Sequence, residues 1–97
     1  MARVDVVGVT KYPKEHVREA VAKAVEARLR DVNASIEKVK KSLKDFETKY
    51  GMATESFYKK HLGGELKENM DSMEWRACKE ISDDLLEEKA LLEEIST

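Results

Sequence analysis

The chain lacks most of what stabilises a small domain on its own. Of its 97 residues one is cysteine, one is proline, four are glycine, and only 6% are aromatic. A single cysteine excludes an intrachain disulfide and suits a reducing compartment. So few prolines and glycines disfavour a turn-rich β protein. No apolar run approaches the ~20 residues of a membrane-spanning helix, and residues 1–5 do not start a signal peptide. We therefore expect one domain over residues 1–97, located in the cytoplasm, with no membrane partner.

Charge is abundant and unevenly spread. Charged residues make up 39% of the chain, hydrophobic residues 41%, and the net charge is −2. Residues 1–50 have an excess of Lys and Arg, whereas residues 51–97 have an excess of Asp and Glu. This composition is enough for amphipathic helices but thin for a self-sufficient core. An acidic half suits a basic partner, although solvated helix faces explain the same charges.

The clearest pattern predicts a long helix over residues 13–50. Pro13 suits a first helical turn, and Gly51 suits a left-handed C-cap. Between them apolar residues recur at steps of three and four, which indicates an a/d seam: Leu29, Val32, Ile36, Val39, Leu43, Phe46 and Tyr50. Such a helix is roughly 55 Å long. We expect it to bend, to break near residues 31–33, or to extend beyond its own core.

Two further helices are expected after Gly51. Thr54 can cap a short helix over residues 54–62, and Asp71 with Glu74 resembles a capping box that opens a third helix over residues 71–95. The stripe expected on the third helix is Trp75, Cys78, Ile81, Leu85, Leu86, Ala90, Leu92 and Ile95. The alternating valines of residues 2–10 suggest an extended arm, 1–12, or a short β-strand. The fold class is therefore all-α: a long helix, a short helix and an antiparallel third helix, forming a helical hairpin or coiled coil.

Such a hairpin leaves the upper part of the long helix uncovered, which calls for a second molecule. Either a homodimer or a different protein would cover it. Exposed aromatic residues near the turn are also preferred interface anchors. The candidate partner-binding residues are Val17, Val21, Val25, Leu29, Tyr50, Tyr58 and Trp75.

Catalytic and metal chemistry find little support in the sequence. His16 and His61 lie far apart, no Glu-x-x-His pair exists, and Cys78 falls on an apolar stripe where it acts as a small hydrophobe. We expect neither an enzyme nor a cofactor or metal site.

A magnesium-dependent all-α nucleotide pyrophosphatase remains a remote alternative. Glu80, Asp83 and Glu87 follow one another on adjacent turns, and Glu15 and Glu19 form an acidic pair on the long helix. Such an enzyme needs carboxylates from two helices to converge on the metal.

DNA binding is a further alternative. A short strand followed by a helix opens a ribbon-helix-helix domain, in which Arg3 and Lys11 would contact DNA. However, the helical pattern continues without Gly or Pro where that fold requires a turn.

Residues 46–76, about a third of the chain, resemble a family of small prokaryotic and archaeal proteins. That family has the pattern F-E-x-K-Y-G-M-x-S-x-x-F, then G-E-L and D-x-x-E-W. The residues that carry the resemblance are Phe46, Glu47, Lys49, Tyr50, Gly51, Met52, Thr54, Phe57, Tyr58, Gly64, Glu65, Leu66, Asp71, Glu74 and Trp75. Thr54 stands where Ser is commoner, and Lys67-Glu68-Asn69 replaces a more acidic link.

Members of this family are often encoded beside a small ribonuclease-type toxin and are taken to be its antitoxin. The resemblance implies an interaction protein that neutralises a toxin by covering its active surface, with the acidic third helix against a basic RNA-binding face. The alternatives from the residues themselves are a structural coiled-coil dimer or a DNA-binding transcriptional regulator.

Overall fold

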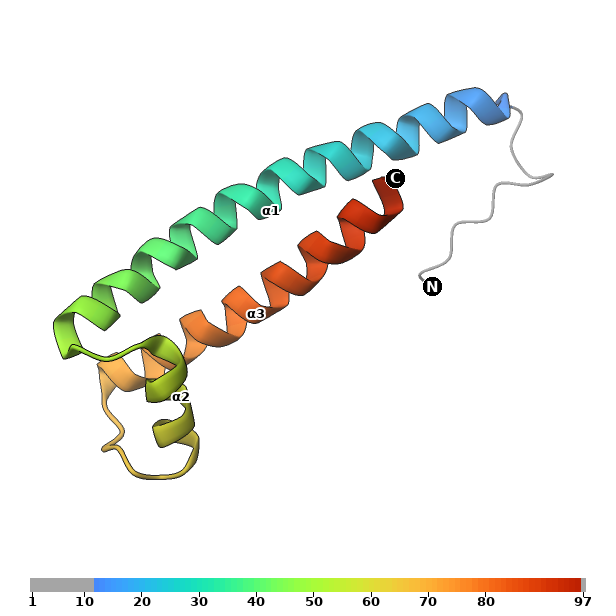
Figure 1. Cartoon of the computed structure of the whole chain (residues 1–97). Helices are drawn as coiled ribbons and strands as arrows, with labels where there is room; N and C mark the ends of the chain where they lie inside the picture. The colour runs from blue at the N-terminus through green and yellow to red at the C-terminus, as the bar shows by residue number, and fades with distance from the viewer. Residues whose placement is uncertain (1–11, 97) are drawn as a thin grey trace.

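A computed structural model describes residues 12–96 and shows three helices, α1 (Lys14–Tyr50), α2 (Thr54–Leu62) and α3 (Met70–Ser96). Figure 1 shows α3 folded back along α1, with α2 at the closed end of the hairpin. The all-α prediction is thus confirmed for the described part of the chain. The predicted arm or strand, with Arg3 and Lys11, lies outside the described residues.

The molecule is a rod rather than a sphere. It measures 59 × 23 × 21 Å, and its radius of gyration is 19.1 Å, against about 13 Å for a compact domain of 100 residues. A rod of paired helices exposes much more surface for its mass than a sphere does. Within the described residues, none of the three helices has an apolar stretch suited to crossing a membrane.

Helix α1 runs without interruption through residues 31–33. Its 37 residues span about 56 Å, whereas the 27 residues of α3 span about 40 Å. Because the two helices lie side by side at the hairpin end, α1 extends past the end of α3 (Figure 1). Gly51 ends α1 at φ +60°, a conformation that glycine adopts without strain, and its N–H bonds to the carbonyl of Glu47.

The predicted seam of α1 is confirmed from Leu29 to Phe46, whereas its last residue, Tyr50, is 43% exposed. Val32 and Ile36 are 1% and 7% exposed and form the centre of the contact with α3. The seam residues on either side are half-buried: Leu29, Val39, Leu43 and Phe46.

The stripe predicted for α3 is only partly right. Ile81, Leu86 and Ile95 are about half exposed, at 49%, 50% and 55%. The buried and half-buried side chains instead follow steps of three and four from the tryptophan: Trp75, Cys78, Ser82, Leu85, Lys89 and Leu92. The buried Trp75 sets this register, so a serine and a lysine lie on the seam while isoleucines lie beside it. A lysine tolerates such a site because its methylenes pack while its ammonium reaches water.

Both predicted side-chain caps are wrong. Ala53 precedes α2, and the Thr54 side chain makes no cap; instead the Thr54 N–H donates to the Glu47 carboxylate at 2.8 Å. Helix α3 begins after Asn69. The Ser72 N–H donates to Asn69 Oδ1 at 2.9 Å, and the Asn69 N–H donates to Ser72 Oγ at 2.8 Å. The capping box therefore lies two residues before the predicted one, and the Asp71 carboxylate is used elsewhere.

The packing of α1 on α3 predicts that truncating a buried seam residue costs much more stability than truncating an exposed residue of the same helices. Val32→Ala should lower the free energy of unfolding by about 2 kcal/mol, because it removes two buried methyl groups and leaves a cavity. Leu86→Ala removes more atoms from an exposed site, and should cost about 0.5 kcal/mol. Urea unfolding followed by circular dichroism measures both. A larger loss in Leu86→Ala than in Val32→Ala would contradict the seam.

Candidate protein-interaction surfaces

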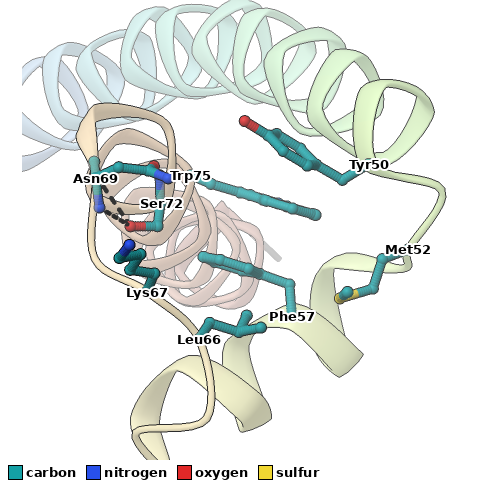
Figure 2. Close-up of a pocket in the computed structure, with 8 residues that line it drawn as sticks. All are labelled: Tyr50, Met52, Phe57, Leu66, Lys67, Asn69, Ser72 and Trp75. Carbon is teal, nitrogen blue, oxygen red and sulfur yellow. Dashed lines mark hydrogen bonds between the residues drawn. The ribbon is translucent and has the colours of Figure 1, made fainter.

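Trp75 joins the three helices at the closed end of the hairpin (Figure 2). Its ring stacks on Phe57 of α2, with centroids 3.9 Å apart and planes 5° apart. Phe46 and Tyr50 of α1 stack with the same ring at 5.5 and 5.7 Å. The indole N–H donates to Thr54 Oγ1 at 3.0 Å, so the buried polar atom is satisfied. Trp75 is 2% exposed, so it belongs to the packing of the hairpin end; its role in partner binding stays a prediction, limited to the lining of a pocket at this end.

The carboxylate of Glu47 holds the start of α2. It accepts the Thr54 N–H, one of the amide groups that a helix leaves unpaired at its first turn. This backbone hydrogen bond, followed by the Thr54 side chain, lowers the pKa of Glu47 below its ordinary value. A residue of α1 thus caps α2 across the Gly51 turn.

The carboxylate of Asp71 closes the hairpin from the other side. It accepts from the Lys49 ammonium at 2.7 Å and from the Tyr50 hydroxyl. These two hydrogen bonds, that of Lys49 first, lower the pKa of Asp71, and the bond to Asp71 raises the pKa of Tyr50. Much of the motif that carries the family resemblance is therefore used to build the hairpin end.

Helix α2 lies on one flank of α3. The Tyr58 hydroxyl donates to Glu80 at 2.7 Å, which raises the pKa of Tyr58. The Lys79 ammonium lies 3.1 Å from Glu55 of α2 and 2.7 Å from Asp83. Tyr58 is half-buried and bonded to α3, so only part of its side chain is accessible to a partner.

A pocket of about 220 Å³ opens at the hairpin end (Figure 2). Its lining is Tyr50, Met52, Phe57, Leu66, Lys67, Asn69, Ser72 and Trp75. Ligand sites for small molecules typically measure 300–1,000 Å³, so this pocket has the size of one large side chain. Asn69 and Ser72 already bond to each other in the cap, which leaves a mainly apolar site.

A second, wider hollow of about 450 Å³ lies at the open end of the hairpin, where α3 ends against α1. Val17, Val21 and Val25 line it together with Ile95. Val21 is 46% exposed, while Val17 and Val25 are half-buried. Three of the predicted partner-binding residues are thus brought together. Leu29 lies in the half-buried seam instead, and Tyr50, 43% exposed, lies at the opposite end.

Across residues 12–96, one long side of the hairpin has no helix packed on it, and the sequence alone did not indicate it. The Arg28 guanidinium pairs with the Glu88 carboxylate through two hydrogen bonds, of 2.6 and 2.9 Å. Hydrogen bonding to Arg28 lowers the pKa of Glu88. Residues seven apart on a helix share a side, so this pair defines a strip that we call the open face: Val21, Arg28 and Ser35 of α1, and Ile81, Glu88 and Ile95 of α3. Helix α2 lies on the other flank, beside Lys79.

The C-terminal half of α3 presents a different surface beyond the reach of α2. Its exposed side chains are mostly acidic, and two leucines of this half, Leu86 and Leu91, are 50% and 58% exposed. We call it the acidic surface: Asp83, Leu86, Glu87, Ala90, Glu93 and Glu94. The sequence revealed the acids, but assigned Leu86 and Ala90 to the core.

The carboxylates considered for magnesium do not converge. Glu80 bonds to Tyr58 at the hairpin end and to Arg76, and Asp83 bonds to Lys79. Glu15 and Glu19 lie in the first turns of α1, at the far end of the rod. Within residues 12–96 no group of three or more His, Cys, Asp or Glu side chains is placed to hold a metal ion.

The remaining two candidate residues also have local roles. Cys78 is half-buried on the α3 seam, and burial, followed by the charge of Glu74, raises the pKa of its thiol. His61 stacks on Phe57 at 5.4 Å, so it belongs to the hairpin-end cluster rather than to an exposed turn.

Comparison with protein-family models, with curated proteins and with solved structures finds no match.

The Glu47 cap predicts an acid-sensitive contribution to stability. Because the pKa of Glu47 is lowered by folding, its carboxylate stabilises the fold above the usual glutamate pKa of about 4.3, and the stabilisation is lost as the pH falls through the folded-state pKa. Glu47→Gln should cost about 1 kcal/mol at pH 7 and much less at about pH 3. Urea unfolding at both pH values measures this. Glu37→Gln, on the exposed surface of α1, is the matched control. A cost for Glu47→Gln that does not change with pH would refute the charged cap.

Proposed function

We propose that this chain is an antitoxin-like protein-binding module, which neutralises a ribonuclease-type toxin by covering the toxin's active surface. The observation that carries the proposal is the acidic surface of α3. Its acids include Glu87 and Glu93, while Asp83 at its edge is paired with Lys79. A ribonuclease binds the phosphates of its substrate with basic side chains, and an acidic surface is complementary to such a site.

The combination of charge with exposed apolar area supports a protein partner. Leu86 is 50% exposed among these acids. Apolar contacts in the centre and charges around them are the usual arrangement of a protein interface, in which charge gives rate and specificity. The hairpin-end pocket, at the other end of α3, can additionally accept one apolar side chain of the same partner.

The rod shape suits this activity. α3 has one side against α1 and an exposed side that runs its whole length (Figure 1). A rigid helix face ordered in advance loses little entropy on binding. The family resemblance of residues 46–76 points to the same activity. The DNA-binding alternative depends on Arg3 and Lys11, which lie outside the described residues, so no contact in the structure favours it.

Co-purification tests the proposal. The tagged chain, expressed at its native level in its own host, should recover a small basic protein whose ribonuclease activity on total RNA is suppressed in the complex. That activity should reappear when the two proteins are separated. Recovery of the chain without such a partner would contradict the proposal.

A pair of charge reversals tests the surface. Glu87→Lys places a positive charge in the acidic surface and should weaken toxin binding by about tenfold or more at low salt. Glu68→Lys makes the same change of net charge in the α2–α3 link and should leave affinity within about twofold. Titration calorimetry against the recovered partner measures both. Equal effects of the two substitutions would show that net charge, and not this surface, directs binding.

A further inference from the structure

The hairpin buries few apolar side chains for a molecule of its length. Among the described residues only four hydrophobic side chains are buried: Val32, Ile36, Phe57 and Trp75. Two of these lie at the hairpin end, so Val32 and Ile36 are the buried hydrophobic pair in the middle of the rod, and the other seam residues there are half-buried. Single cores of chains this short provide little net stability, and such chains commonly gain the rest by association.

The open face has the residues of a helix-packing surface. Ile81 and Ile95 are 49% and 55% exposed, and Val21 is 46% exposed. The open face recurs every seven residues along each helix, with Arg28 and the small side chain of Ser35 after Val21 on α1, and Glu88 between the two isoleucines on α3. Two-helix coiled coils bury only a and d positions, whereas helices in larger bundles also bury one flanking position. The flanking position here is apolar at Val21, Ile81 and Ile95, small at Ser35, and charged at Arg28 and Glu88.

The charges on the open face favour a second copy of this chain as the partner. Arg28 and Glu88 neutralise each other, so the open face attracts neither a basic nor an acidic partner. A second copy matches it residue by residue. We propose that two copies of this chain pack open face to open face into a four-helix bundle, with the two-fold axis along the rod and both hairpin ends together.

Two-fold symmetry decides between the possible orientations. An axis along the rod places α1 of one copy against α3 of the other, at the same height. Val21 then faces Ile95, Arg28 faces Glu88, and Ser35 leaves room for Ile81 of the second copy. An axis across the rod at the height of the ion pair would place Arg28 against Arg28 and Glu88 against Glu88. Like charges in a dehydrated interface are strongly unfavourable, which favours the first arrangement.

The area suits a dimer that dissociates reversibly. From Val21 to Ser35 the helix rises about 21 Å, and the molecule is 21 Å across in its narrow direction. The strip therefore offers about 440 Å² per copy, which is in the range of small, weak interfaces. The dimer uses the open face and leaves the acidic surface free, so it goes beyond the proposed function and does not depend on it.

Sedimentation equilibrium of the full chain over a range of concentrations tests the dimer. We expect a mass of twice the 11.1 kDa chain, with dissociation on dilution. Ile81→Gln should weaken the dimer by about tenfold or more, because each dimer contains the substituted side chain twice. Leu86→Gln is the matched control: it lies on the same helix and is equally exposed, at 50%, but is on the flank of α2. It should leave the dissociation constant within about twofold.

The results that would overturn the dimer are distinct from those that would overturn toxin binding. A monomer at all concentrations overturns the dimer, as does a dimer that Ile81→Gln does not weaken, or one that both variants weaken equally. Circular dichroism verifies that each variant remains helical. Loss of toxin binding in Glu87→Lys with an intact dimer would separate the two surfaces.

The relative orientation of the two copies is tested by a separate measurement. Spin labels at Met70→Cys, in a Cys78→Ser background, mark the hairpin ends of the two copies. The proposed arrangement gives a label–label distance well inside the 59 Å length of the rod. A distance comparable with that length indicates hairpin ends at opposite ends of the bundle, and overturns the proposed axis.

Discussion

The stacking of Trp75 is the interaction on which the rest of the structure depends. One face of the indole packs on Phe57 of α2, and Phe46 and Tyr50 of α1 also stack with the ring. Its N–H bonds to the first residue of α2. Without this tryptophan, α3 could pack against α1 in a register shifted by one heptad, because the seam repeats every seven residues. The tryptophan removes that freedom, since only one position on α3 can fill the space between α1 and α2.

The register set at this end determines the surfaces of the rod. It places Arg28 opposite Glu88, far along the hairpin, and it turns Ile81 and Ile95 to one flank. The other flank receives α2 through Lys79 and Tyr58. The acidic surface and the open face are therefore consequences of one packing event. Under the two proposals, one surface of the rod pairs with a second copy while the other presents acids to another protein.

The elements were readable from the sequence because their signals are local. The seam of α1 repeats without interruption through Val32 and Ile36, and Gly51 ends the helix where its left-handed conformation is needed. The bounds of α2 were predicted correctly. The caps were predicted wrongly because the sequence shows which side chains can cap, but not which of them is engaged elsewhere. Thr54 receives the Trp75 N–H, and Asp71 is bonded to Lys49 and Tyr50.

The sequence by itself determined three helices and their approximate ends, because the spacing of apolar residues and the glycine that ends α1 are local signals, carried by residues close together in the chain. Which side of α3 is buried was decided only by the tertiary structure. Hydrophobicity ranks Ile81, Leu86 and Ile95 above Ser82 and Lys89 as core residues, yet the contact geometry fixed by Trp75 buries the second pair more than the first three. Packing at a distant point outweighs the local preference of each side chain. The apolar residues that it leaves at the surface are the ones available for partners.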